Sequence, residues 1–136
     1  MSSEAPFTAV RTLVETTWSG APVVWPNEGL EVADSSSPWI YMDMSGHEMG
    51  AMELGPTAAY AERGTLWAHI QAPVGTGTLE IRTIAKQLSD LFRTASIPGM
   101  TFGRQNLGAG EPGDDDGLYW RQSFTVDYIW PDVYTD

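Results

Sequence analysis

Residues 64–92 read GTLWAHIQAPVGTGTLEIRTIAKQLSDLF, and the hydrophobic period of this stretch changes at its centre from two residues to about 3.6. Residues 64–72 alternate between apolar and other side chains, which predicts a strand with one buried face. Pro73 and the glycines that follow it predict a turn, and Thr78 stands where a helix N-cap is expected. The apolar stripe of the predicted helix consists of Ile81, Ile84, Ala85, Leu88, Leu91 and Phe92.

The segments on either side add one more helix and several strands. Apolar steps of three and four predict a helix over residues 4–18, and Pro98-Gly99 closes the second helix. The remaining predicted strands cover residues 23–25, 39–44, 100–107 and 118–130, and the predicted loops cover residues 28–38 and 108–117. This order predicts an α+β fold in which two helices pack on a mainly antiparallel sheet. We expect one domain over residues 1–136, with a hairpin arm or flexible loop at 45–60 and a short acidic tail at 131–136.

Composition narrows the class of function. The 136 residues are 42% hydrophobic, which is sufficient for one core, and the chain carries 18 acidic and only seven basic residues, a formal net charge of −11. This charge disfavours specific nucleic-acid binding, which depends on Lys and Arg. The absence of cysteine excludes disulfides and thiol catalysis. The sequence has no signal-peptide pattern and no apolar run long enough for a membrane span, so we expect a soluble chain in the cytoplasm when it is made.

No motif for catalysis, a cofactor or a metal is complete. The 75–78 segment, GTGT, lies between strand and helix but lacks the lysine of a phosphate-binding loop. The 114–117 segment, DDDG, lacks the alternating acids of a calcium loop, and Ala51 stands where a zinc-protease motif starting at His47 requires its second histidine. We therefore expect no enzyme activity, no cofactor and no metal.

Tryptophan is abundant for a domain of this size. Six tryptophans and five tyrosines are more than one small core is expected to enclose, and aromatic residues and methionine are enriched at protein interfaces. A tryptophan-rich core and an obligate oligomer both remain open on composition alone.

The order of these segments resembles the tail terminator (tail completion) family of long-tailed bacteriophages and related gene transfer agents. The resemblance rests on the segments WPNE at 25–28, PWIYM at 38–42, RGTLWAHIQAP at 63–73, GTG at 75–77, IAKQL at 84–88, LF at 91–92 and WRQSFTVDY at 120–128. It covers about residues 10–128, and the chain departs from the family pattern at 28–37 and 45–60.

The resemblance implies a structural virion protein at the head–tail interface, made in the host cytoplasm. It implies subunits that close into a hexameric ring, cap the head-proximal end of the tail tube, stop its polymerisation and join the tail to the head. The implied partners are further copies of the chain, the tail tube protein and a neck head-completion protein. Alternatives are a neck head-closure or adaptor protein, a tail tube subunit, or a small acidic module with an aromatic pocket.

Two groups of residues are candidates for contact sites in such a ring. The candidate subunit or tube interface comprises Met42, Met44, Met49, Met52, Trp39, Trp67 and Trp130. DNA must pass through the ring without binding to it, so a neutral or acidic channel is expected. The candidate channel-facing acids are Asp114, Asp115 and Asp116, with Glu48 and Glu53 as a second group.

Overall fold

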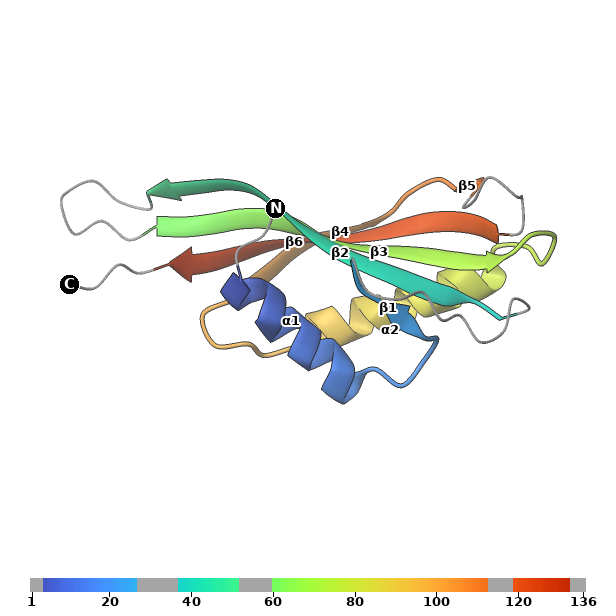
Figure 1. The fold of residues 1–136 in the computed structure, drawn as a ribbon, viewed down its shortest axis with the longest axis horizontal. Helices are drawn as coiled ribbons and strands as arrows, with labels where there is room; N and C mark the ends of the chain where they lie inside the picture. The colour runs from blue at the N-terminus through green and yellow to red at the C-terminus, as the bar shows by residue number, and fades with distance from the viewer. Residues whose placement is uncertain (1–3, 27–36, 52–59, 113–118, 133–136) are drawn as a thin grey trace.

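The computed structural model describes residues 4–26, 37–51, 60–112 and 119–132. Its elements are α1 (Glu4–Thr17), β1 (Val23–Val24), β2 (Trp39–Ala51), β3 (Tyr60–Pro73), α2 (Leu79–Thr94), β4 (Thr101–Leu107), β5 (Glu111–Pro112) and β6 (Tyr119–Asp132). The strands form one sheet of order β1-β2-β3-β6-β4, with β5 paired to β6. Both helices lie on the same side of this sheet (Figure 1). The predicted α+β fold is confirmed.

The long antiparallel pair β3–β6 is the centre of the sheet. Its register runs from Tyr60↔Asp132 to Pro73↔Tyr119 without a shift. Every second residue of β3 therefore faces the helices, and Leu66, Ala68, Ile70 and Ala72 are all at most 1% exposed. The alternation read from the sequence is confirmed on this strand.

Strand β2 forms the next row and extends well beyond its outer neighbour. It pairs with β3 from Trp39 to Ala51, with a bulge between Gly46 and Glu48. The parallel strand β1 covers only Ile40 and Tyr41. At the end of the sheet where β2 stops, β2, β3 and β6 extend past the helices (Figure 1).

Helix α2 supplies much of the core. Ile81 and Leu88 are fully buried, and the rings of Phe92 and Phe102 lie 5.1 Å apart, which ties the helix to β4. The turn before α2 contains Gly75 and Gly77 at φ values of 89° and 80°, a conformation that favours glycine.

Thr78 occupies the N-cap position of α2, but its side chain makes no capping hydrogen bond. Its hydroxyl accepts instead from Arg82 Nε at 3.2 Å. The backbone at Thr78 has φ −112° and ψ 0°, outside the β region in which a capping hydroxyl usually reaches the amides of the first turn. The predicted N-cap position is therefore confirmed, although the Thr78 side chain does not cap the helix.

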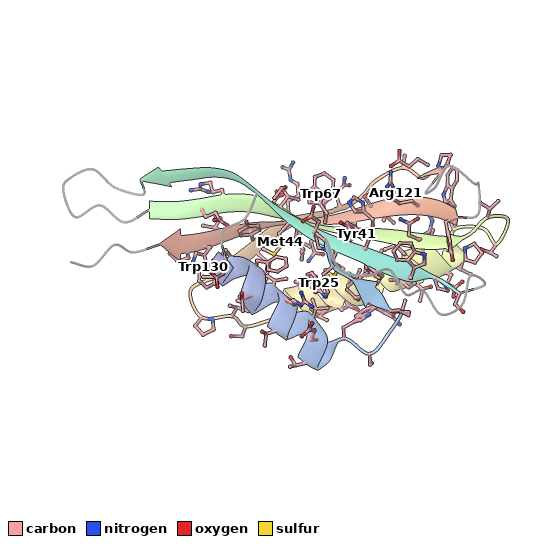
Figure 2. All side chains as sticks on the ribbon, viewed as in Figure 1. Trp25, Tyr41, Met44, Trp67, Arg121 and Trp130 are labelled. Atoms are coloured by element: carbon pink, nitrogen blue, oxygen red, sulfur yellow. The ribbon has the colours of Figure 1, made fainter. Side chains whose placement is uncertain are left out.

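Helix α1 packs through one face onto the start of the sheet. Val10 and Val14 are buried, and Trp25 is 4% exposed on the helix side of the sheet (Figure 2). Phe7 meets the Trp25 ring edge-on at 5.6 Å, and the Arg11 guanidinium lies 5.3 Å from its centroid. These contacts make Trp25 a core residue.

Three predicted boundaries differ from the structure. Residues 45–51 continue β2, so the first part of the predicted arm is a strand paired with β3. The predicted loop at 108–117 contains the short strand β5, and Pro131 and Asp132 belong to β6 rather than to the tail. In each case the boundary is set by pairing with another strand, which local composition does not reveal. Among the described residues, neither helix is long and apolar enough to cross a membrane.

Candidate functional site

The face of the sheet opposite the helices carries a column of stacked rings. Tyr41 on β2 and His69 on β3 stack with centroids 6.1 Å apart, and Trp67 stacks on His69 at 5.8 Å. The Trp67 indole donates to Ser45 Oγ at 3.0 Å, and Figure 2 shows Trp67 and Arg121 on the side away from the helices. We call this side the open face. Its aromatic rings are half-buried without any helix above them, as is typical of a contact surface.

His69 is the one histidine whose side chain is described, and its surroundings favour the neutral form of the ring. Its Nδ1 lies 2.6 Å from Ser123 Oγ. Burial lowers the pKa of His69 below its usual 6.5, and Arg121 lowers this pKa further, while Asp43 and Glu111 raise it in part. Arg121 is itself paired with Glu111 at 2.7 Å. Within the described part of the chain, the hydrogen-bond partner of the His69 ring is the Ser123 hydroxyl.

One end of the sheet is apolar. Trp39 and Tyr119 meet edge-on at 5.9 Å, and Trp120 borders a hollow of about 210 Å³ beside the β3–α2 turn. Val74 and Leu79 at this end are 54% and 78% exposed, the two large hydrophobic side chains that stand out in the described chain. The indole nitrogens of Trp39 and Trp120 are buried and have no hydrogen-bond partner among the described residues. This end is a second candidate contact surface.

A larger hollow, of about 470 Å³, lies on the open face near the outer strand β4. It is lined by Arg63, Thr65, Thr101, Arg104, Asp127 and Ile129, together with backbone at neighbouring positions. Thr65 donates to Asp127 Oδ1 at 3.2 Å across β3–β6. A bulge between Phe102 and Gln105 inserts an extra residue into β4, and Arg104 lies in that bulge with its side chain exposed. We call this feature the arginine hollow. No local pattern in the sequence predicts it, because it depends on the pairing of β4 with β6.

The structure separates the predicted interface residues. Trp67 lies on the open face, Trp39 lies at the apolar end, and Trp130 is partly buried against the core. Met42 and Met44 are 0% and 4% exposed and belong to the core beneath the sheet, which removes them from the surface that a neighbour can reach. The alternation of Ile40, Met42 and Met44 already pointed to one buried face.

The other predicted residues lie beyond what the structure describes. The side chains of Glu48 and Met49 are not described, and Met52, Glu53 and residues 114–116 lie outside the described residues. Their assignments therefore stay predictions.

Glu62 is a buried acid that sequence reasoning missed. It is 4% exposed, and its Oε2 accepts a hydrogen bond of 2.6 Å from the hydroxyl of Tyr128. Its position in β3 could have revealed it, because Glu62 lies on the same face of the strand as the buried Leu66. No group of three or more His, Asp or Glu side chains within the described ranges is placed to hold a metal ion.

Comparison with known proteins identifies the family. A family model described as "Phage tail terminator protein" matches residues 7–128. The chain belongs to the phage tail terminator family. Membership gives it a structural role in the phage tail and makes it a component of the virion tail. The match takes in the ring column, the apolar end and the arginine hollow except for Ile129.

Structural comparison supports the same architecture. A solved structure aligns with a TM-score of 0.65 at 15% identity, covering 98% of this chain and 100% of that one. This likeness concerns the fold. No curated protein sequence matches the chain.

Proposed function

We propose that the chain forms a hexameric ring that caps the head-proximal end of the phage tail tube. The ring stops tube polymerisation and provides the surface to which the head is joined. The observation that carries this proposal is the family match over residues 7–128, which includes most of α1, all of α2 and most of the sheet.

The shape of the subunit suits a closed ring. A ring requires that one patch on a subunit meets a different patch on the next. The sheet has two unlike edges, β2 with the short β1 on one side and β4 on the other. It also has one face covered by helices and one open face (Figure 1). These four surfaces provide separate sites for two neighbours, a tube end and a neck protein.

The tail tube protein and a neck head-completion protein are the proposed partners, besides further copies of the chain. Trp67 on the open face and Trp39 at the apolar end are the described aromatic contacts available to them, with Trp130 at the rim of the core. Met49 and Met52 are also proposed to belong to this contact surface. In this proposal the protein acts by binding and by geometry and catalyses no reaction.

DNA passes through the ring, so its channel is proposed to be neutral or acidic. Residues 114–116 are the leading candidates for acids at the channel or its mouth. The subunits would be made and assembled in the host cytoplasm and would end at the head–tail interface of the virion.

A neck head-closure or adaptor protein and a tail tube subunit are the alternative functions. The matching family model favours the terminator over both. Electron microscopy of particles from a phage that lacks this chain tests the choice. The expected result is tails of abnormal length without heads. Headless tails of normal length would favour the neck role, and the absence of tubes would favour the tube subunit.

A further inference from the structure

From the geometry of the two sheet edges we infer that the arginine hollow beside β4 binds the free edge of β2 of a neighbouring copy, with Arg104 facing Asp43. This inference rests on the proposed ring and names the side chains that join its subunits. Both residues belong to the open face, and they lie at opposite edges of the same sheet.

Charge balance is the first argument. A subunit with net charge −11 repels its copies, so contacts between them need basic groups that are not already neutralised. Four of the seven basic residues form ion pairs within the subunit: Arg11 with Glu15, Lys86 and Arg93 with Asp90, and Arg121 with Glu111. Arg82 bonds to Thr78. Arg104 makes no ion pair or side-chain hydrogen bond with any described residue.

The bulge in β4 is the second argument. It adds one residue between the pairs Phe102↔Tyr128 and Gln105↔Val126, and Arg104 is part of this insertion. Bulges at sheet edges redirect side chains and interrupt pairing. Here the bulge gives the outermost strand an exposed cation beside a hollow, with Arg63 as a second cation in its lining.

Asp43 stands at the complementary position on the other edge. The Ile40 amide donates outward to Pro22 of the β1 segment, at 2.8 Å. Amides two and four residues further along a strand point to the same side, so the Met44 amide also points to the outer edge. That amide donates to Asp43 Oδ1 at 2.7 Å, which holds the carboxylate at the edge that β1 leaves uncovered. The other carboxylate oxygen of Asp43 would be available to Arg104 of a neighbouring copy.

Asp43 and Arg104 lie at similar positions along the strand direction. Asp43 lies in the row Asp43–Trp67–Thr125–Asn106, and Arg104 is two residues from Asn106. Two strand residues correspond to about 7 Å, a stagger that tilted strands in a closed ring readily supply. In the sheet β2 runs antiparallel to β3 and β4 runs parallel to it, so β2 and β4 of neighbouring copies would meet antiparallel.

A mixing experiment tests this pairing. Arg104→Glu and Asp43→Arg are made separately, and assembly is measured by sedimentation velocity, alone and with purified tail tubes. Each variant places two like charges in every contact, and it should raise the protomer concentration for half assembly by about tenfold or more. In an equimolar mixture, alternating subunits restore an attractive pair in every contact. The mixture should therefore assemble within about threefold of the wild-type concentration.

Controls separate charge from folding. Arg93→Glu and Glu15→Arg make the same charge changes on exposed helix positions and should leave assembly unchanged. Asp43→Asn removes the charge but keeps an oxygen for the Met44 amide, and it should weaken assembly without lowering Tm.

The outcomes are distinct. Normal assembly of either charge reversal would overturn the inference, as would a mixture of folded variants that fails to assemble. If Arg104→Glu assembles normally but changes the rate of DNA ejection, the hollow contacts phosphate instead. A wild-type chain that stays monomeric even with tail tubes would refute the proposed ring, whereas intact rings of Arg104→Glu refute only the edge contact.

Discussion

Tyr128 lies directly opposite Gly64 in the β3–β6 ladder, and its ring occupies the space that a side chain on Gly64 would fill. A Cβ at Gly64 would lie 2.6 Å from the Tyr128 hydroxyl oxygen and 2.4 Å from the carbonyl oxygen of Ser45. The glycine thus lets the tyrosine ring cross the strand and reach Glu62, two residues away, with a 2.6 Å hydrogen bond. The conformations of Gly64, Tyr128 and Glu62 therefore depend on one another.

Tyr128→Phe should destabilise the subunit. It removes the hydroxyl that donates to the buried Glu62 carboxyl, which costs about 1–3 kcal/mol in the free energy of unfolding. Tyr41→Phe on the open face is the matched control and should change stability by less than about 0.5 kcal/mol. Urea unfolding of both variants measures the difference. Equal midpoints would show that this hydrogen bond contributes nothing to stability.

Gly64→Ala should also destabilise the subunit, because the added methyl group would displace the Tyr128 ring or the backbone of β2. Overpacking of this kind costs about 1–3 kcal/mol. Gly103→Ala is the control, because a Cβ there would meet its nearest atom at 3.8 Å. Thermal unfolding should lower Tm for the first change and leave it nearly unaltered for the second. A tolerated Gly64→Ala would contradict the close approach.

Met42→Ala should act on the folding of each subunit, since Met42 is fully buried beneath the sheet. The expected loss is about 2–5 kcal/mol in the free energy of unfolding. Met42→Leu keeps the volume and should cost less than about 1.5 kcal/mol. Unfolding is measured below the concentration at which subunits assemble. If Met42→Ala weakened assembly but not the isolated subunit, Met42 would belong to an interface.

The pH dependence of stability should change when His69 is replaced by Gln. Burial lowers the pKa of His69 in the folded chain, so between this value and the usual 6.5 the unfolded chain binds more protons. The wild type should therefore keep its full stability above about pH 6.5 and lose stability as pH falls below it. His69→Gln should flatten this decline between pH 7 and 5. Parallel curves for the two proteins would mean that His69 titrates alike in both states.

Replacement of Asp114, Asp115 and Asp116 by Lys should slow DNA ejection and make its rate more dependent on salt. Basic residues at the channel would bind phosphate, and salt weakens such contacts. Lys substitutions at Glu4, Glu15 and Glu80 make the same charge change on the helices as a control. Ejection rates are compared in particles of normal shape at several salt concentrations. Unchanged rates would exclude residues 114–116 from the DNA path.

The sequence predicted the elements whose signal is local. Alternation in residues 64–72 and the apolar stripe of α2 depend on neighbours within one element, and the structure has both. The same alternation, continued back along β3 to Glu62, predicts that this acid is buried as well. The sequence analysis did not extend the strand to Glu62, because the partner that allows its burial, Tyr128, lies 66 positions away.

The candidate contact surfaces were harder to predict from the sequence. Met42 and Met44 were assigned to an interface by their residue type, although their alternation with Ile40 indicated the core. The arginine hollow depends on a bulge and on pairing between β4 and β6, which leave no mark within either segment. The alternation in residues 64–72 puts Trp67 on the face opposite Leu66, but the stacking of Tyr41 on His69 beside it required the register of β2 against β3.

The central β3–β6 pair also determines when a newly made subunit becomes complete. Side-chain hydrogen bonds between these strands join residues 54, 62 and 66 positions apart, and β6 is made after every other described element. Such long-range contacts form late in folding. Until β6 has left the ribosome, β3 lacks its central partner and β4 has no strand to pair with. The outer edge of β4 therefore does not exist on the nascent chain, and neighbouring subunits can join only after β6 has been synthesised and inserted.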